Sequence, residues 1–499
     1  MNTKHIWLIL VFMGLISCES DDDGTSEIVE PIALTSGSAD FSTYVALGNS
    51  LTAGYTDGAL FPASQENSMT KMLSLKFSLA GGGGFTQPLM NDNFGGLLVG
   101  GNQILENRLV FNGTAPVRLE ALVGPVTPTT DLLVNNPTGP FNNMGVPGAK
   151  SFHLLFDGYG NLGNLQAGMS NPYFIRMASA PNATVLGDAM AQAPTFFTLW
   201  IGNNDILGYA TTGGDGTNPI TDQQTFDFAY NTLITTLTSG GAKGVVANIP
   251  NVSAIPHFTT VPHNPVPLDE ATAAAVNNAY APYNGGLQTA VAALAGTGLF
   301  SAEEAAQRTI VFQAGPNNAV VIEDETLTDL GAINPAFAGL PKYRQATEND
   351  LLVLPASSFI GTLADPNNPL TVNGVAIPLA DKWVLLPSEQ QDIATATASF
   401  NATIAAAATA AGLAQVDANS LLDELAGGGI QSGNFTLTSS LVTGGAFSLD
   451  GIHPTSRGYA LIANEFLKAI DATYGSNFEA SGNLNDVGTF PTNYSVMLP

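Results

Sequence analysis

The middle of the chain alternates between buried strands and an amphipathic helix, a pattern that few fold classes can accommodate. Residues 196–201 (FFTLWI) form a continuous apolar run that stops at Gly202, which is typical of a strand buried in a parallel sheet. Residues 222–237 place Phe, Tyr, Leu and Ile on one helical face, and residues 244–250 repeat the buried-strand pattern. Strand, helix and strand in succession predict an α/β fold.

Other segments extend this pattern towards both ends of the chain. Residues 44–47 predict a first strand, and residues 413–417 predict a last one. Helices are expected at residues 68–79, 388–412 and 455–470. The second of these helices has Ser388 as its expected N-cap and ends near Gly412.

Two stretches are harder to assign. Residues 81–150 are rich in Gly, Asn and Pro, so we expect mostly loops there. Residues 268–294 are Ala-rich and predict a helix, with Pro282 and the Gly285-Gly286 pair interrupting it. The latter helix belongs to an insertion at about residues 251–386, which we expect to pack over the core and to form a wall of the site.

Charge and composition exclude some classes of partner. The chain is 45% hydrophobic, enough for a sizeable core, but only 11% charged, with a formal net charge of −27. A surface of this sign repels phosphate groups and anionic lipid. We therefore expect no nucleic acid partner and no electrostatic docking on a membrane.

The first residues predict a different kind of membrane attachment. Lys4 precedes an apolar run at residues 6–16, which has the length of a signal peptide and is too short to span a bilayer. The run ends in Leu-Ile-Ser-Cys at residues 15–18, which resembles the lipobox of bacterial lipoproteins. That resemblance implies cleavage before Cys18 and acylation of this residue, the single cysteine of the chain. The alternative is a simple secretory signal with an incidental cysteine.

An acidic stretch follows the cysteine. Residues 19–24 (ESDDDG) resemble the surface-export signal of Bacteroidetes lipoproteins, although a solvated linker has the same composition. The expected organisation is a signal peptide at residues 1–17, a flexible acidic tether at 18–40, one large α/β domain at 41–475 with its insertion, and a C-terminal extension at 476–499.

Three short motifs lie where predicted strands end or the last helix begins. The first is Gly-Asn-Ser-Leu at residues 48–51, directly after the first strand. A serine at this edge of an open α/β sheet can present its hydroxyl to a ligand, but it needs an adjacent base to act as a nucleophile. A turn serine that caps the next helix would give the same pattern.

The second motif is Asp-Gly-Ile-His-Pro at residues 450–454, just before the last helix. A carboxylate three residues before a histidine can accept from one ring nitrogen, which leaves the other free to act as a base. The alternative is a capping Asp450 beside a surface His453.

The third motif is Gly-Asn-Asn-Asp at residues 202–205, at the end of the buried strand. An Asn side-chain amide can donate to the negative charge that develops on a carbonyl oxygen during acyl transfer. The same four residues are also ordinary turn chemistry.

Together these motifs resemble those of the SGNH (GDSL) family of serine hydrolases. Residues 48–51 resemble its first block, residues 202–205 its G-x-N-D block and residues 450–453 its closing D-x-x-H block. Residues 143–148 (NMGVPG) are similar to its glycine block, and all four occur in the family's order.

The resemblance implies a role for each matching residue. Ser50 would be the nucleophile, His453 the general base and then the general acid, and Asp450 the residue that orients and stabilises His453. The oxyanion hole would consist of the Ser50 and Gly148 backbone N–H groups and the Asn204 side chain. The family fold is a three-layer, flavodoxin-like α/β/α sandwich with about five parallel strands, and it implies no metal and no organic cofactor.

The sequence departs from the family pattern in two places. Asn49 replaces the usual Asp; it keeps an acceptor oxygen but lacks the charge, so we expect the loop geometry to survive. In the glycine block Gly145 competes with Gly148, which we prefer because of its spacing from Asn143.

The expected function is hydrolysis of carboxylic esters, as in esterases and lipases, at or outside the cell envelope. A carbohydrate O-acetylesterase uses the same fold and triad, so an acetylated glycan is an alternative substrate to an acyl lipid. A surface-binding lipoprotein that has lost activity is a third reading. We expect a monomer anchored through lipidated Cys18 in a bacterial outer membrane, facing either the periplasm or the cell surface.

Overall fold

The computed structural model describes residues 32–368 and 370–498. The expected signal peptide, the lipidated Cys18 and the acidic stretch after it lie outside the described residues. The chain divides after Ala33, and Leu34–Pro499 form one compact unit. Among the described residues, no helix is long and apolar enough to cross a membrane.

Both ends of this unit pack against its body. Residues 34–40, assigned above to the tether, are part of it: the Ser38 N–H donates to the Tyr474 carbonyl at 2.8 Å. In the C-terminal extension, the Tyr494 hydroxyl donates to the Ala63 carbonyl at 3.0 Å. The folded unit therefore begins before residue 41 and includes the residues after 475.

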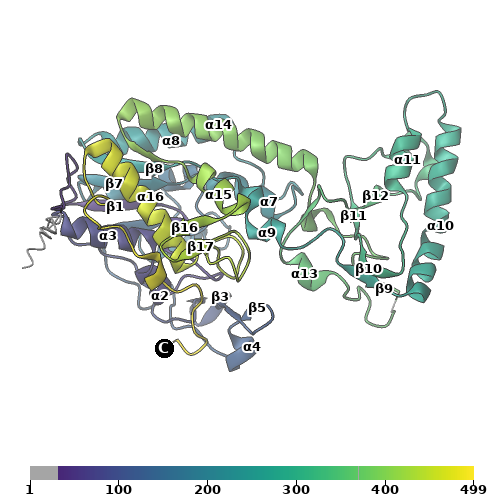
Figure 1. Cartoon of the computed structure of the whole chain (residues 1–499), viewed down its shortest axis with the longest axis horizontal. Coiled ribbons are helices and arrows are strands. Elements are labelled where there is room, and N and C mark those ends of the chain that lie inside the picture. Colours follow the sequence, from purple (N-terminus) through teal and green to yellow (C-terminus); the bar gives the residue numbers. More distant parts are fainter. Residues whose placement is uncertain (1–31, 369, 499) are drawn as a thin grey trace, which may run out of the picture. The chain divides into compact units, whose positions relative to one another are not determined.

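A five-stranded parallel sheet lies at the centre of the unit (Figure 1). Its strands, in spatial order, are β15 (Ala414–Val416), β8 (Lys243–Ala247), β7 (Phe196–Trp200), β1 (Tyr44–Gly48) and β6 (Asn143–Gly145). The strands predicted from their apolar runs are confirmed. The prediction of mostly loops at residues 81–150 is confirmed, but this stretch also contains β6 and other short elements of three or four residues each, which are too short to show a period.

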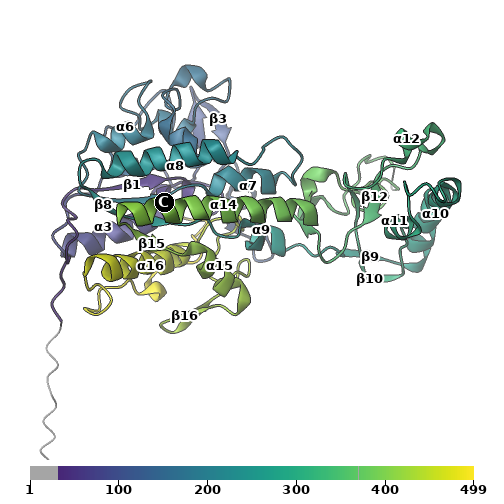
Figure 2. The ribbon, with the colours of Figure 1, turned by 90° about the horizontal axis from the view of Figure 1, so that it is seen from above.

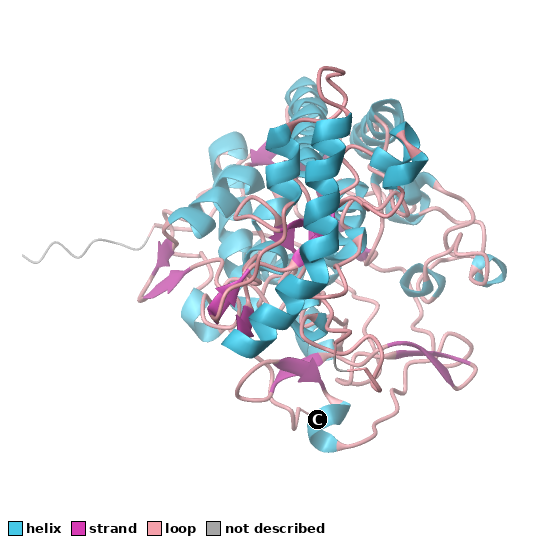
Figure 3. Ribbon diagram, turned by 90° about the vertical axis from the view of Figure 1, so that its right-hand side faces the viewer, coloured by secondary structure: helices cyan, strands magenta, loops and turns pink. Residues whose placement is uncertain are grey.

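Helices cover both faces of the sheet, an arrangement compatible with a three-layer α/β/α fold (Figure 2). One face packs on α8 (Gln223–Thr238), α14 (Pro387–Ala411) and α6 (Val185–Met190). The other face packs on α3 (Met69–Leu79) and α16 (Ser456–Tyr474). Figure 3 shows further short strand pairs outside the central sheet.

Capping residues set the ends of several predicted helices. Ser68 accepts from the Lys71 N–H before α3, and Thr455 accepts from the Gly458 N–H before α16, so both predicted helix starts are confirmed. The last helix runs one turn further than predicted, to Tyr474.

The predicted start of α14 is wrong. Leu386 is its N-cap and Pro387 its first residue, so Ser388 lies inside the first turn. Pro387 suits this position because its missing N–H would have no partner there, and the Glu389 carboxylate instead accepts from the Leu386 N–H at 2.6 Å. Gly412 does end the helix, in the left-handed conformation.

The predicted interruption of the Ala-rich helix is also wrong. Helix α10 (Glu270–Ala293) continues through Pro282 and the two glycines that follow. Tertiary hydrogen bonds hold the helix on both sides of the proline: the Tyr280 hydroxyl donates to the Val375 carbonyl at 2.7 Å, and the Asn284 amide donates to the Ile310 carbonyl at 2.8 Å. These bonds offset the loss of one helical hydrogen bond.

The insertion that contains α10 also holds α11 (Ala302–Arg308) and six short strands, of which β13 (Leu351–Leu352) and β14 (Val384–Leu385) form one pair. The other four are β9 (Val266–Leu268), β10 (Gly315–Asn318), β11 (Val321–Glu323) and β12 (Tyr343–Gln345). Figures 1 and 2 show α10 and α11 set apart from the central sheet. Val252 and Ile255 of the insertion line the pocket of the candidate site described below. The insertion also contacts the loop that carries Asp450 and His453, where the His257 N–H donates to the Gly451 carbonyl at 2.9 Å.

Candidate active site

Ser50 lies at the carboxyl end of β1, where the chain turns into the short helix α1 (Ser50–Ala53). The turn depends on Gly48, since a Cβ there would lie 2.4 Å from the Trp200 carbonyl oxygen. Asn49 is the N-cap, and its side-chain oxygen accepts from the Leu51 N–H at 3.0 Å. The acceptor that Asn49 shares with Asp therefore does hold this turn.

The structure brings Ser50 next to His453, although 403 residues separate them in the chain. Ser50 Oγ lies 2.8 Å from His453 Nε2, and His453 Nδ1 lies 2.8 Å from Asp450 Oδ2. An ionised carboxylate can only accept, so Nδ1 carries the ring proton and Nε2 is the acceptor for the serine hydroxyl. The ring of Tyr55 packs on the imidazole, with the two centroids 4.6 Å apart.

The Asp450 carboxylate accepts five hydrogen bonds. Oδ1 accepts from the Ser448 hydroxyl at 2.9 Å and from the backbone N–H groups of Ile452 and His453 at 2.8 and 2.9 Å. Oδ2 accepts from His453 Nδ1 at 2.8 Å and from the Gly58 N–H at 2.9 Å. Burial acts to raise the pKa of Asp450, but the His453 charge and these hydrogen bonds hold it well below the usual range of an Asp.

The loop that carries Asp450 and His453 is closed on itself. The Ser448 N–H donates to the His453 carbonyl at 2.8 Å, and the Gly451 N–H donates to the Ser448 carbonyl at 3.0 Å. Gly451 has φ +70°, and a Cβ there would lie 3.0 Å from the His257 nitrogen, so glycine fits this position on both counts.

Residues 55–58 hold this loop from the nucleophile's side, and the sequence analysis did not single them out. The Asp57 N–H donates to the Ser448 hydroxyl at 3.0 Å, and Asp57 Oδ1 accepts from the Leu449 N–H at 3.1 Å. The Thr56 hydroxyl donates to the Pro454 carbonyl at 2.9 Å. Burial raises the pKa of Asp57 to about 7. Asp57-Gly58 is a recognisable turn dipeptide, but its distant partners leave no local signal.

Asn204 connects the turns that carry the expected oxyanion groups. Asn204 lines the same pocket as Ser50, and its Nδ2 donates to the Ala149 carbonyl at 2.9 Å, next to Gly148. Among the hydrogen bonds of the described residues, none uses the N–H of Ser50 or of Gly148. Gly145, by contrast, is buried in β6 and donates its N–H to Asn143 Oδ1 at 3.0 Å. Gly148 therefore keeps an available donor, which Gly145 lacks.

Asp205 fixes the segment that carries Gly148. The buried Asp205 carboxylate accepts from the Ser151 backbone N–H at 2.8 Å and from the Ser151 hydroxyl at 2.7 Å. Asn204 and Asp205 thus connect the turn after β7 to the turn after β6. The last two residues of the Gly-Asn-Asn-Asp motif therefore have different structural roles: Asn204 binds the Ala149 carbonyl and Asp205 binds Ser151.

Ser50 and His453 open onto a pocket with mainly apolar walls. Its polar lining is confined to residues of the motifs and their neighbours: Asn49, Ser50, Asn203, Asn204 and His453. All its other lining side chains are apolar, and most of them come from α15 (Ala418–Gly427), α16 and residues 250–255. Gly148 lines a separate hollow, together with Phe152, Tyr159 and Asn171.

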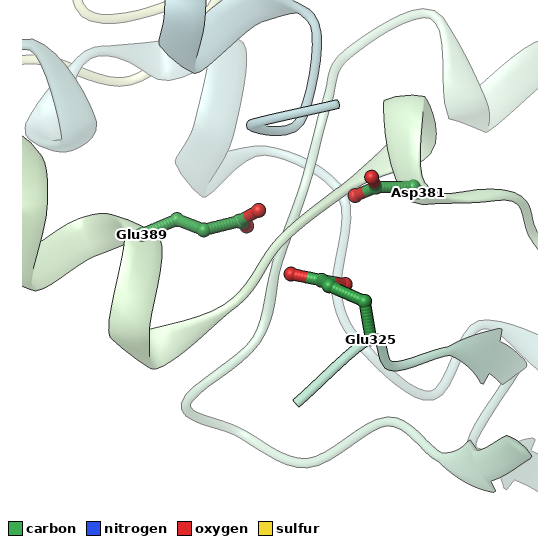
Figure 4. Close-up of side chains that lie close together, drawn as sticks. All are labelled: Glu325, Asp381 and Glu389. Carbon is green, nitrogen blue, oxygen red and sulfur yellow. The ribbon is translucent and has the colours of Figure 1, made fainter. Parts of the chain in front are cut away.

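A group of acidic side chains lies away from this pocket, where Glu325, Asp381 and Glu389 face one another (Figure 4). One carboxylate oxygen of each lies within 4.8 Å of the others, which makes them possible metal ligands. Burial and the neighbouring carboxylates raise the pKa of Glu389 to about 8 and that of Asp381 to about 6. A proton held on Glu389 at neutral pH relieves the repulsion within this group without an ion.

Comparisons with known proteins add no relative. A scan against protein-family models finds no match to this chain, and searches of curated proteins and of solved structures find none either. The chemistry of the site therefore has to follow from its own geometry.

Proposed function

We propose that this protein is a serine hydrolase that cleaves carboxylic esters through an acyl-enzyme on Ser50. The observation that carries the proposal is the unbroken chain of hydrogen bonds from Ser50 Oγ through His453 to Asp450, at 2.8 Å for each link. A serine hydroxyl is a weak nucleophile alone, and an imidazole held in the correct tautomer activates it.

The proposed reaction has two halves. Ser50 Oγ attacks the ester carbonyl carbon while its proton passes to His453 Nε2, and that proton then goes to the leaving alkoxide as the C–O bond breaks. Water attacks the resulting acyl-enzyme with His453 again as base, which releases a carboxylic acid and restores Ser50. Asp450 stays ionised and stabilises the imidazolium in both halves.

The oxyanion of each tetrahedral intermediate needs donors that are free before the substrate binds. The unused N–H groups of Ser50 and Gly148 meet this requirement. The Asn204 amide donates one of its two hydrogens to the Ala149 carbonyl and has the second one for the oxyanion. These three groups come from the turns after three adjacent strands, β1, β6 and β7. Such an edge is where ligands bind in open α/β sheets.

We infer that the chain is a member of the SGNH family. Two independent features support the inference: the four motifs in the family's order, and a five-stranded parallel sheet with the serine directly after its first strand. We also propose that Cys18 carries a lipid anchor to a bacterial outer membrane. Cys18→Ala should then move the protein from the membrane fraction to the soluble fraction.

The deciding experiment uses the full-length protein in detergent and p-nitrophenyl acetate. We expect turnover by the native protein, none by Ser50→Ala, and native turnover by Ser78→Ala, which changes an exposed serine of α3. A fluorophosphonate should label the native protein once and leave Ser50→Ala unlabelled. Full activity of Ser50→Ala would overturn the proposal, as would absence of both turnover and labelling in the folded native protein.

A further inference from the structure

The pocket beside Ser50 has apolar walls built from separate parts of the chain. Helix α15 contributes Leu421, Leu422 and Leu425, and α16 contributes Leu461 and Ile462. Figures 1 and 2 show these two helices side by side. The stretch after β8 supplies further aliphatic side chains. All these apolar side chains line the same pocket as the nucleophile Ser50.

Few polar side chains of the described residues line this pocket. They are the side chains of Asn49, Ser50, Asn203, Asn204 and His453, all in the motifs described above. The Asn49 side-chain amide donates a hydrogen bond to Asn203 Oδ1 at 3.3 Å. Ser50, Asn204 and His453 are therefore the polar side chains that can contact the reacting ester. In the part of the chain that the structure describes, no Asp, Glu, Lys or Arg lines the pocket. Sugar hydroxyl groups that entered it would lose their water without gaining partners.

We propose that this pocket binds the acyl chain of the substrate, an unbranched aliphatic chain longer than acetyl. This inference rests on the proposed ester hydrolysis at Ser50. It names an aliphatic acyl ester as the substrate class, in place of an acetylated glycan. An acetyl group leaves the leucines of α15 without a partner.

The position of the pocket assigns it to the acyl side of the ester. The acyl carbon is bonded to Ser50 Oγ in the intermediate, and its carbonyl oxygen is the atom that Asn204 would bind. Both residues line this pocket. The second hollow starts at Gly148 and has His153, Ser170 and Asn171 in its lining, so it offers the alcohol a separate and more polar place.

Burial of the chain predicts a definite dependence on chain length. Each methylene transferred from water to an apolar wall raises kcat/KM by up to about fourfold, as long as the wall continues. We therefore expect kcat/KM to rise from acetate towards octanoate or decanoate. The rise should stop where the chain reaches the far end of the pocket.

The test measures kcat/KM of the full-length protein in detergent for p-nitrophenyl esters from acetate to decanoate. Leu421→Trp narrows the pocket from a position that is only partly buried, and Leu425→Ala widens it. We expect the ratio of decanoate to acetate to fall at least tenfold in Leu421→Trp. In Leu425→Ala the preferred length should move to longer chains. Leu75→Trp, at a 55% exposed position of α3, should keep the native ratio.

Ratios within one sample do not depend on how much protein is folded, so a partly folded variant still reports on the pocket. A flat chain-length profile with measurable acetate turnover would overturn the acyl pocket and leave the proposed hydrolase intact. A rise with chain length in alkyl acetates, from methyl to decyl, and not in the acyl series would place the chain on the alcohol side and overturn the assignment. No turnover of any ester would instead defeat the proposed function itself.

Discussion

Gly58 and His453 meet at one oxygen of Asp450: the Gly58 N–H donates to Oδ2 at 2.9 Å, and His453 Nδ1 lies 2.8 Å from the same atom. Gly58 belongs to the segment that begins at the nucleophile, whereas Asp450 and His453 belong to the last loop before α16. The nucleophile and its base are therefore held in register by the carboxylate as well as by their own contact.

Asp450→Asn tests this shared oxygen. If the amide nitrogen of Asn takes the place of Oδ2, it faces the Gly58 N–H and His453 Nδ1–H, which are both donors. The imidazole then moves its proton to Nε2, which can no longer accept from the Ser50 hydroxyl. We expect kcat on p-nitrophenyl acetate to fall by about 10⁴-fold. Asp392→Asn, an exposed change on α14, serves as the control. A loss of less than tenfold would contradict the proposed role of Asp450.

Substitutions of Asp57 test whether the hydrogen bonds from residues 55–58 position the loop that carries Asp450 and His453. Asp57→Asn keeps an acceptor for the Leu449 N–H, whereas Asp57→Ala leaves that buried N–H without one. We expect Asp57→Ala to lower kcat by about tenfold through misplacement of His453, with little change in KM, and Asp57→Asn to retain most of the activity. Equal losses in the two variants would show that the charge of Asp57 matters more than its hydrogen bond.

Asn204→Ala tests the oxyanion donor. Loss of one such donor typically lowers kcat by about 10²- to 10³-fold, and we expect a loss of this size. The melting temperature should fall slightly, because the hydrogen bond from Asn204 to the Ala149 carbonyl contributes about 1 kcal/mol to the free energy of unfolding. Asn231→Ala, on the exposed side of α8, is the matched control. Native kcat in Asn204→Ala would remove this residue from the oxyanion hole.

Glu389 should make the stability of the protein depend on pH. Burial raises its pKa to about 8 in the folded state from the ordinary 4.5 of a glutamate, so between these pH values the folded protein binds more protons than the unfolded chain. The free energy of unfolding should then fall as pH rises through this window, by at most about 1.4 kcal/mol per pH unit.

Glu389→Gln removes this titration and keeps an acceptor for the Leu386 N–H. Urea unfolding at pH 5 to 9 should therefore give a flatter profile for Glu389→Gln than for the native protein. Glu348→Gln, which changes an exposed carboxylate, should keep the native slope. If calcium added at pH 8 raises the melting temperature of the native protein but not of Glu389→Gln, the acidic group binds a cation, and the proton-sharing account of it fails.

The elements predicted correctly from sequence share a strong local signal. The strand β7 is one apolar run, and α8 and α16 carry an apolar face at helical spacing with a capping side chain before them. The errors occurred where packing outweighed local preference. Helix α10 continues through Pro282 because tertiary hydrogen bonds hold it, and β6 is a strand because β1 lies beside it.

The amino-acid sequence by itself determined the α/β class and placed Asp450 within reach of His453, since a separation of three residues in a turn can bring a carboxylate to an imidazole. Only the tertiary structure decided that this pair meets Ser50, that residues 55–58 hold its loop, and that α15 and α16 enclose an apolar pocket beside it. The physical reason is the distance along the chain between the residues that interact. Periodicity and capping involve residues a few positions apart, whereas these contacts form only when the sheet aligns the ends of its strands.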